Sequence, residues 1–207
     1  MTTLYLVLFI AALGLLWTRN MRLSIALLAL EGAVLSIMVW SSGYRSWTSA
    51  LVALSTLAIK AGLIPTALSK MVRATPTEVR QDQSLPLWAY AAAVVVTLGT
   101  VHIISLLGPS HLIQDKVAFF YSLSTVYLGM VMIIARRHLL SQIAALVSIE
   151  NGLVLLGVSL AGSLPTLVEF GILVDLVIAV TLLVWTGRRI HREFQTTDVV
   201  ALQQLKG

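Results

Sequence analysis

Apolar runs long enough to cross a membrane follow one another along most of the chain, and no other feature constrains the fold as strongly. A transmembrane helix needs about 20 mainly apolar residues. Only 11% of the residues are charged, whereas soluble domains carry about 25%, so this chain cannot cover a soluble surface. The runs predict an all-α, polytopic membrane helix bundle with about seven transmembrane helices, at residues 3–17, 23–40, 47–67, 87–107, 117–135, 139–161 and 164–185.

The ends of these runs carry two further signs of a membrane. All five Trp residues fall at or beside a predicted helix end, where the amphipathic indole ring prefers the headgroup level. Most basic residues fall on one side: Arg19, Arg22, Lys70, Arg73, Arg80, Arg136, Arg137, Arg188, Arg189, Arg192 and Lys206. The other side has only Arg45 and Lys116. The positive-inside rule therefore places the N-terminus outside and the C-terminus in the cytoplasm.

A polar linker divides the predicted bundle. Residues 1–71 form a first three-helix membrane unit, 72–86 a cytoplasmic loop, 87–187 a four-helix membrane unit and 188–207 a cytoplasmic tail. The helix trios 1–3 and 5–7 both contain a basic turn followed by a helix with one deep glutamate, Glu31 or Glu150. This pattern suggests a parallel repeat of helices 1–3 and 5–7, with helix four as the return spacer.

Several kinds of chemistry have no residues to support them. The chain has no cysteine, so it offers no disulfide, thiolate-held iron–sulfur cluster or thiol nucleophile. It shows no Gly-rich phosphate loop, His pair at metal spacing or Ser/His/Asp arrangement, so no catalytic residue, cofactor or metal is expected in this chain. The net charge of +5 lies in short clusters between apolar runs, so topology explains it better than nucleic acid does.

Ionisable residues inside the predicted spans are the candidates for function. They are Glu31, Lys60, Glu150, Glu169 and Asp175, with His102 as a possible relay residue. A charged side chain in the membrane core costs roughly 2.5 to 3.5 kcal/mol on insertion scales, so such residues pair or face water. A buried lysine with acidic neighbours can exchange protons near neutral pH, which a proton relay requires.

Each candidate also has a structural interpretation. Glu31 could be a single interhelical hydrogen-bonding group, and His102 a satisfied interhelical histidine. Glu169 lies about one turn inside its helix end and could reach the interface. Lys60 and Glu150 are too deep to reach the interface, so they form either a relay or a static ion pair. The same alternatives apply to Asp175.

Lys60 is followed closely by a proline. Pro65 cannot donate a hydrogen bond to the carbonyl of Ala61, so the helix should loosen beside the lysine and line a buried or hydrated place. An ordinary proline kink near a helix end is the alternative.

The second half of the chain resembles a known family. The motifs are Ile149-Glu150-Asn151-Gly152, the run LPTLVEFG at 164–171 with Asp175, Thr197-Asp198 and the final Leu205-Lys206-Gly207. Together they resemble the hydrogenase-4 component E family, whose members look like relatives of the antiporter-like subunit K of respiratory complex I. The resemblance is looser over the first half.

The resemblance implies roles for five residues. Glu150 matches the glutamate of the family's Glu-Asn-Gly motif, Glu169 and Asp175 match its helix-seven acids, and Lys60 matches its buried lysine. Glu31 departs from the hydrogenase pattern and looks more like the subunit K glutamate. These residues would contribute to proton translocation.

The resemblance also implies a setting. The chain would be a non-catalytic membrane-arm subunit of a hydrogenase or formate hydrogenlyase-type complex in the bacterial or archaeal cytoplasmic (inner) membrane. Its expected partners are larger antiporter-like membrane subunits, soluble redox subunits on the cytoplasmic side that hold iron–sulfur and nickel–iron centres, and the lipid bilayer, with no nucleic acid. A purely structural arm subunit and a free-standing proton-coupled transporter are the alternatives.

Overall fold

The described residues fold into helices. The computed structural model describes residues 1–42, 47–74, 86–107, 113–161 and, beyond them, 171, 174, 176–178, 180, 181, 184, 185 and 189. In these residues no β-strand occurs, and the elements are α1 (Thr2–Trp17), α2 (Met21–Ser42), α3 (Trp47–Thr56), the π-helix η1 (Leu57–Leu63), α4 (Ile64–Ala74), α5 (Leu87–Leu107), α6 (Lys116–Ala135) and α7 (Leu139–Ala161). The elements α3, η1 and α4 form one continuous helix.

Five helical stretches in the described part of the chain are long and apolar enough to cross a membrane: Met21–Ser41, Ala50–Arg73, Trp88–Leu107, Lys116–Ala135 and Leu139–Leu160. Thr2–Trp17 is a shorter apolar helix. The first six predicted helices are present with bounds close to the predicted ones, except that the third continues to Ala74 instead of ending at residue 67. The seventh predicted helix lies mostly outside the described residues, so the seven spans stay a prediction.

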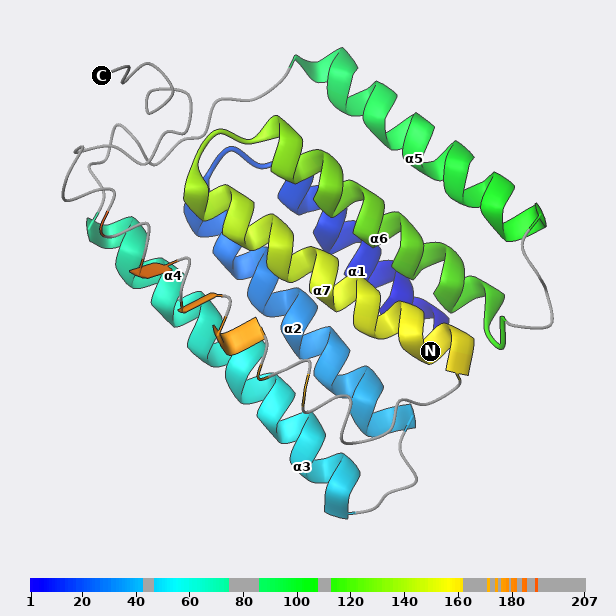
Figure 1. Cartoon of the computed structure of the whole chain (residues 1–207), viewed down its shortest axis with the longest axis horizontal. Helices are drawn as coiled ribbons and strands as arrows, with labels where there is room; N and C mark the ends of the chain where they lie inside the picture. Colours follow the sequence, from blue (N-terminus) through cyan, green and yellow to red (C-terminus); the bar gives the residue numbers. More distant parts are fainter. Residues whose placement is uncertain are drawn as a thin grey trace.

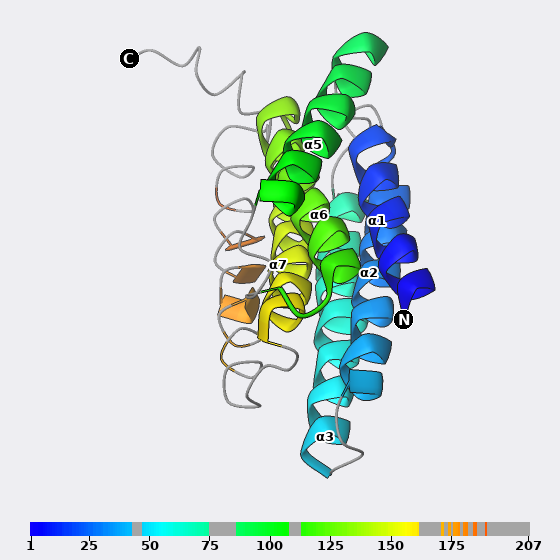
Figure 2. The same ribbon diagram turned by 90° about the vertical axis from the view of Figure 1, so that its right-hand side faces the viewer.

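The helices lie side by side around a central group of α1, α2, α6 and α7. Helix α2 packs on α1, α7 and the α3–η1–α4 helix, and α6 packs on α1, α5 and α7. Figure 1 shows the α3–η1–α4 helix along one edge and α5 along the opposite edge, and Figure 2 shows the same bundle from the side. The main core lies between α1, α2, α4, α6 and α7.

Arg136 fixes the relative direction of α1 and α6. Its Nη2 atom donates hydrogen bonds to the carbonyls of Leu15 (3.4 Å), Leu16 (2.7 Å) and Thr18 at the end of α1. A cation suits this position because the last carbonyls of a helix have no partner within the helix. The two predicted basic turns, after α1 and after α6, therefore lie at the same end of the bundle, called here the basic end.

Asp115 orders the opposite end. Its side chain accepts hydrogen bonds from the backbone N–H groups of Val117 and Ala118 and so caps the start of α6. The hydroxyl of Tyr5 on α1 donates to the same carboxylate at 3.2 Å. The two ends of the bundle are thus held by different polar contacts. The parallel repeat itself stays a prediction.

Candidate functional site

The π-helix η1 carries Lys60 into the core. The backbone N–H of Ile64 donates to the carbonyl of Ile59, five residues back, instead of four as in an α-helix. Pro65 follows at once; it has no N–H, and its ring crowds the carbonyl of Ala61. The predicted loosening beside Lys60 is thus present as a π segment, a feature that often occurs at functional sites.

Gly32 lets α2 approach this segment closely. A Cβ atom built on Gly32 would lie 2.8 Å from the carbonyl carbon and the Cβ of Lys60, and 3.0 Å from the amide nitrogen of Ala61. These distances leave no room for a side chain. The glycine therefore brings its neighbour Glu31 next to the lysine.

A chain of hydrogen bonds joins five side chains from three helices; we call these residues the relay cluster: Glu31, Lys60, Ser148, Glu150 and Asn151. Lys60 Nζ forms an ion pair with Glu150 Oε2 and donates to Asn151 Oδ1 at 2.9 Å. Asn151 Nδ2 donates to Glu31 Oε2 at 3.0 Å, and Ser148 Oγ donates to Glu31 Oε1 at 3.0 Å. The two acids are thus connected through an amide and an ammonium group.

The lysine decides how the amide of Asn151 is oriented. An ammonium group only donates hydrogen bonds, so the oxygen of Asn151 must face Lys60 and its NH₂ group must face Glu31. Oε2 of Glu31 is therefore held as an acceptor. A proton on Glu31 would reside on Oε1, because the Ser148 hydroxyl can either donate or accept.

The relay cluster is buried. The exposed fractions are 0% for Glu31 and Asn151 and 1% for Lys60, and the Glu150 side chain is 15% exposed. Its Oε1 atom is buried and has no hydrogen-bond partner among the described residues. With all three groups ionised the cluster would carry one excess negative charge, which is costly in an apolar interior. Binding of one proton would balance it.

Glycines also position α7, which carries three members of the relay cluster. A Cβ on Gly152 would lie 2.8 Å from Val126 Cγ2 and 3.1 Å from the carbonyl oxygen of Ser122. Close packing of α6 on α7 therefore requires this glycine. In the Glu-Asn-Gly motif, the glutamate pairs with Lys60, the asparagine links Lys60 to Glu31, and the glycine allows the contact with α6.

The structure brings three of the six candidate residues together: Glu31, Lys60 and Glu150. His102 is exposed on α5, so it lies outside the cluster. The candidates Glu169 and Asp175 lie outside the described residues. In the described part, no group of three or more His, Cys, Asp or Glu residues could hold a metal ion.

Sequence reasoning missed two members of the cluster. Asn151 was noted only as part of the Glu-Asn-Gly motif, and Ser148 was not considered. Ser148 lies three residues before Asn151 on the same helix face, so a search for polar residues at helical spacing around Glu150 could have found it. Neutral polar residues at helical spacing around Glu150 are the signal, because buried polar groups need hydrogen-bond partners.

The chain is similar in sequence to two groups of known proteins. No family model matches the chain, and no solved structure matches it significantly. The chain is 28% identical to a Mycobacterium tuberculosis protein named "Uncharacterized protein Rv0085" over 206 residues, covering 96% of this chain and 92% of that protein. It is 39% identical over 92 residues to hydrogenase-4 component E of Escherichia coli, covering 44% of this chain and 43% of that protein, and equally to the Shigella flexneri protein of the same name. The chain is thus similar to hydrogenase-4 component E over less than half of either length.

Proposed function

We propose that this chain is a non-catalytic membrane subunit of a hydrogenase-type or complex I-like redox complex, and that its relay cluster takes part in proton translocation. The similarity to hydrogenase-4 component E supports the first part, because the name of that relative describes one component of a larger assembly. The apolar helices support a place in the membrane.

The hydrogen-bond chain from Ser148 to Glu150 is the observation that carries the second part. The carboxyl groups of Glu31 and Glu150 and the amine of Lys60 can each bind and release a proton, and Asn151 holds Glu31 and Lys60 in one hydrogen-bonded chain. Glu150 Oε1, buried and unpartnered among the described residues, can accept a proton from a further donor. Glu31 can hold a proton at the other end. Glu169 and Asp175, on the seventh helix predicted from the sequence, would extend the path.

The electron-transfer centres belong to other chains in this proposal. Iron–sulfur clusters need thiolate ligands, and this chain has no cysteine. Iron–sulfur and nickel–iron centres would therefore sit on soluble partner subunits at the basic end of the bundle, with larger antiporter-like subunits beside it in the cytoplasmic membrane.

Affinity purification of the tagged chain from its native membrane tests membership of a complex. Redox subunits that contain iron–sulfur clusters should co-purify with it at a fixed ratio. Recovery of the chain alone, folded and free of other subunits in mild detergent, would contradict the proposal and favour a free-standing transporter.

Glu150→Gln tests proton translocation. Glutamine keeps the shape and can accept a hydrogen bond from Lys60 but cannot titrate, so the complex should assemble, transfer electrons and move fewer protons per electron. Asp115→Asn is the matched control, because it makes the same chemical change at the cap of α6, outside the cluster, and asparagine also caps helices well. Unchanged translocation in Glu150→Gln would leave only a structural role for this acid.

A further inference from the structure

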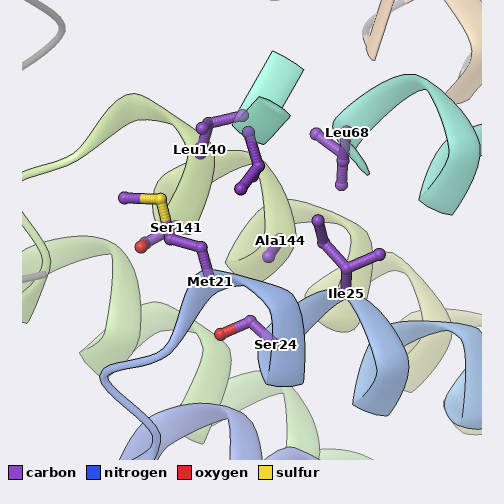
Figure 3. A pocket seen from close by; sticks show the side chains of 8 residues that line it. Met21, Ser24, Ile25, Leu68, Leu140, Ser141 and Ala144 are labelled. Atoms are coloured by element: carbon purple, nitrogen blue, oxygen red, sulfur yellow. The ribbon is translucent and has the colours of Figure 1, made fainter. Parts of the chain in front are cut away.

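A hollow lies between α2, α4 and α7 at the basic end of the bundle. The empty space in and at the mouth of the hollow is about 230 Å³, open solvent included, and its lining is Met21, Ser24, Ile25, Leu68, Val72, Leu140, Ser141 and Ala144. Figure 3 shows these side chains converging from the three helices. Met21 begins α2 directly after the first basic turn, and Leu140 lies just after the second.

The hollow points along the same helix interface that holds the relay cluster. Ser24 and Glu31 are seven residues apart on α2, and Ser141 and Ser148 are seven residues apart on α7. Seven residues are close to two helical turns, so each pair lies on one face at a separation of about 10 Å along the helix. The hollow therefore lies on the same faces of α2 and α7 as the relay cluster, about two helical turns nearer the basic end.

Its polar lining comes from two buried serines, Ser24 and Ser141, which are 6% and 5% exposed. The hydroxyl of Ser24 donates to the carbonyl of Asn20 at 3.3 Å, which leaves its oxygen free to accept. A buried water needs two to four polar partners, and two hydroxyl groups in one hollow can provide them.

One dry layer separates the hollow from the cluster. Leu28 lies between Ser24 and Glu31 on α2, and Ile64 lies between Leu68 and Lys60 on the α3–η1–α4 helix. Both side chains are 0% exposed and belong to the same core. An apolar layer one turn thick stops water, and hence protons, unless the helices part or a polar group replaces it.

We infer that the hollow at Ser24 and Ser141 is the hydrated entrance through which the relay cluster exchanges protons with the basic end, and that Leu28 and Ile64 form the gate. This inference rests on the proposed function and specifies that the relay cluster exchanges protons with the basic end of the bundle. Passage requires only a separation of two side chains. The gate thus prevents a passive leak while leaving Glu31 about two helical turns from Ser24 and the water beside it.

Accessibility of introduced cysteines tests the entrance. The natural chain has no cysteine, so the full-length protein in its membrane needs no background substitutions. Ser24→Cys, Ser141→Cys, Leu28→Cys and the control Ser122→Cys, which is 0% exposed on α6, are treated with Ag⁺ in inverted vesicles. Remaining thiols are then counted with a maleimide after denaturation.

The two entrance variants should react with Ag⁺ at least about tenfold faster than Leu28→Cys and Ser122→Cys, a ratio that corresponds to ~1.4 kcal/mol. Equal rates at all four positions would overturn the entrance. The rate of reaction with Ag⁺ does not depend on proton pumping, so equal rates would overturn only the entrance. An unchanged pumping ratio in Glu150→Gln would overturn the proposed function instead.

A second measurement tests the gate. Leu28→Asn should raise the passive proton leak of vesicles without turnover, and adding Glu31→Gln should remove that leak because the path then ends at a group that cannot titrate. Leu128→Asn, at a similarly buried leucine on α6 (1% exposed), is the control for general loosening. An equal leak in Leu28→Asn and Leu128→Asn would refute the gate.

Discussion

Replacing Lys60 with Met removes the positive charge of the relay cluster while keeping an unbranched side chain of similar length. Among the described residues, Lys60 makes an ion pair with Glu150 and a 2.9 Å hydrogen bond to Asn151. The loss of the charge has different consequences for a static ion pair and for a proton relay, so this variant separates the two interpretations.

The expected free-energy costs follow from these contacts. In a static pair, Glu150 stays ionised and loses its counter-ion, and breaking a buried pair in this way costs ~3 to 5 kcal/mol. In a relay, Glu150 takes up a proton and becomes neutral, so the main remaining loss is the charged hydrogen bond to Asn151, ~1.5 to 3 kcal/mol. The proposed function predicts the smaller cost.

Two assays read the outcome. The yield of assembled complex should be near normal in Lys60→Met, while proton translocation in reconstituted vesicles should be lost. Lys70→Met is the matched control because Lys70 lies on α4, ten residues after Lys60, and is exposed; it should change neither quantity.

A failure of assembly in Lys60→Met, followed by recovery in the double variant Lys60→Met/Glu150→Gln, would refute the relay reasoning. That pattern would mean that the ionised acid, and not a missing proton path, causes the defect. Lys60 and Glu150 would then form a structural ion pair.

Three further predictions concern packing, helix ends and topology. Gly32→Ala should cost ~1 to 3 kcal/mol of stability because its Cβ would meet the backbone of Lys60. Gly14→Ala should cost less, because its Cβ meets only a movable leucine side chain at 3.0 Å. Thermal unfolding in detergent compares the two variants, and equal costs would contradict the close approach of α2 to the π-helix. Arg136→Met should lower stability by ~1.5 to 3 kcal/mol through loss of charged hydrogen bonds to the end of α1, and an unchanged melting temperature would contradict this role. A cysteine placed at Thr197 should be shielded from an impermeant reagent outside intact cells, and labelling there would reverse the predicted orientation.

The helix positions could be predicted because the membrane fixes their length. Apolar runs of about 20 residues, bounded by Trp and Arg, leave little freedom for where a helix begins and ends. The third helix runs past its predicted end at residue 67 to Ala74, because Ser69, Lys70 and Arg73 are polar without being helix breakers.

The rotation of each helix about its axis could not be predicted from the sequence. Helix α5 is apolar on all faces, so periodicity gives no inward side, and His102 lies on an exposed face. For Lys60 the π segment changes the register of the helix, and with it the face that the lysine occupies. The cost of charge in a membrane predicts that the lysine and the acids must pair. The hydrogen bonds through Asn151, however, depend on how three helices, α2, η1 and α7, are each rotated about their axes.

The number of protons moved per electron in variants of the two connected acids tests the central claim most directly. Glu31 and Glu150 are joined through Asn151 and Lys60, so they should act on one path. Purified complexes carrying Glu31→Gln, Glu150→Gln or both, reconstituted in vesicles, should each retain electron transfer and show a reduced ratio, with the double variant no lower than the more impaired single variant. A double variant that translocates protons at the full natural ratio would contradict the account.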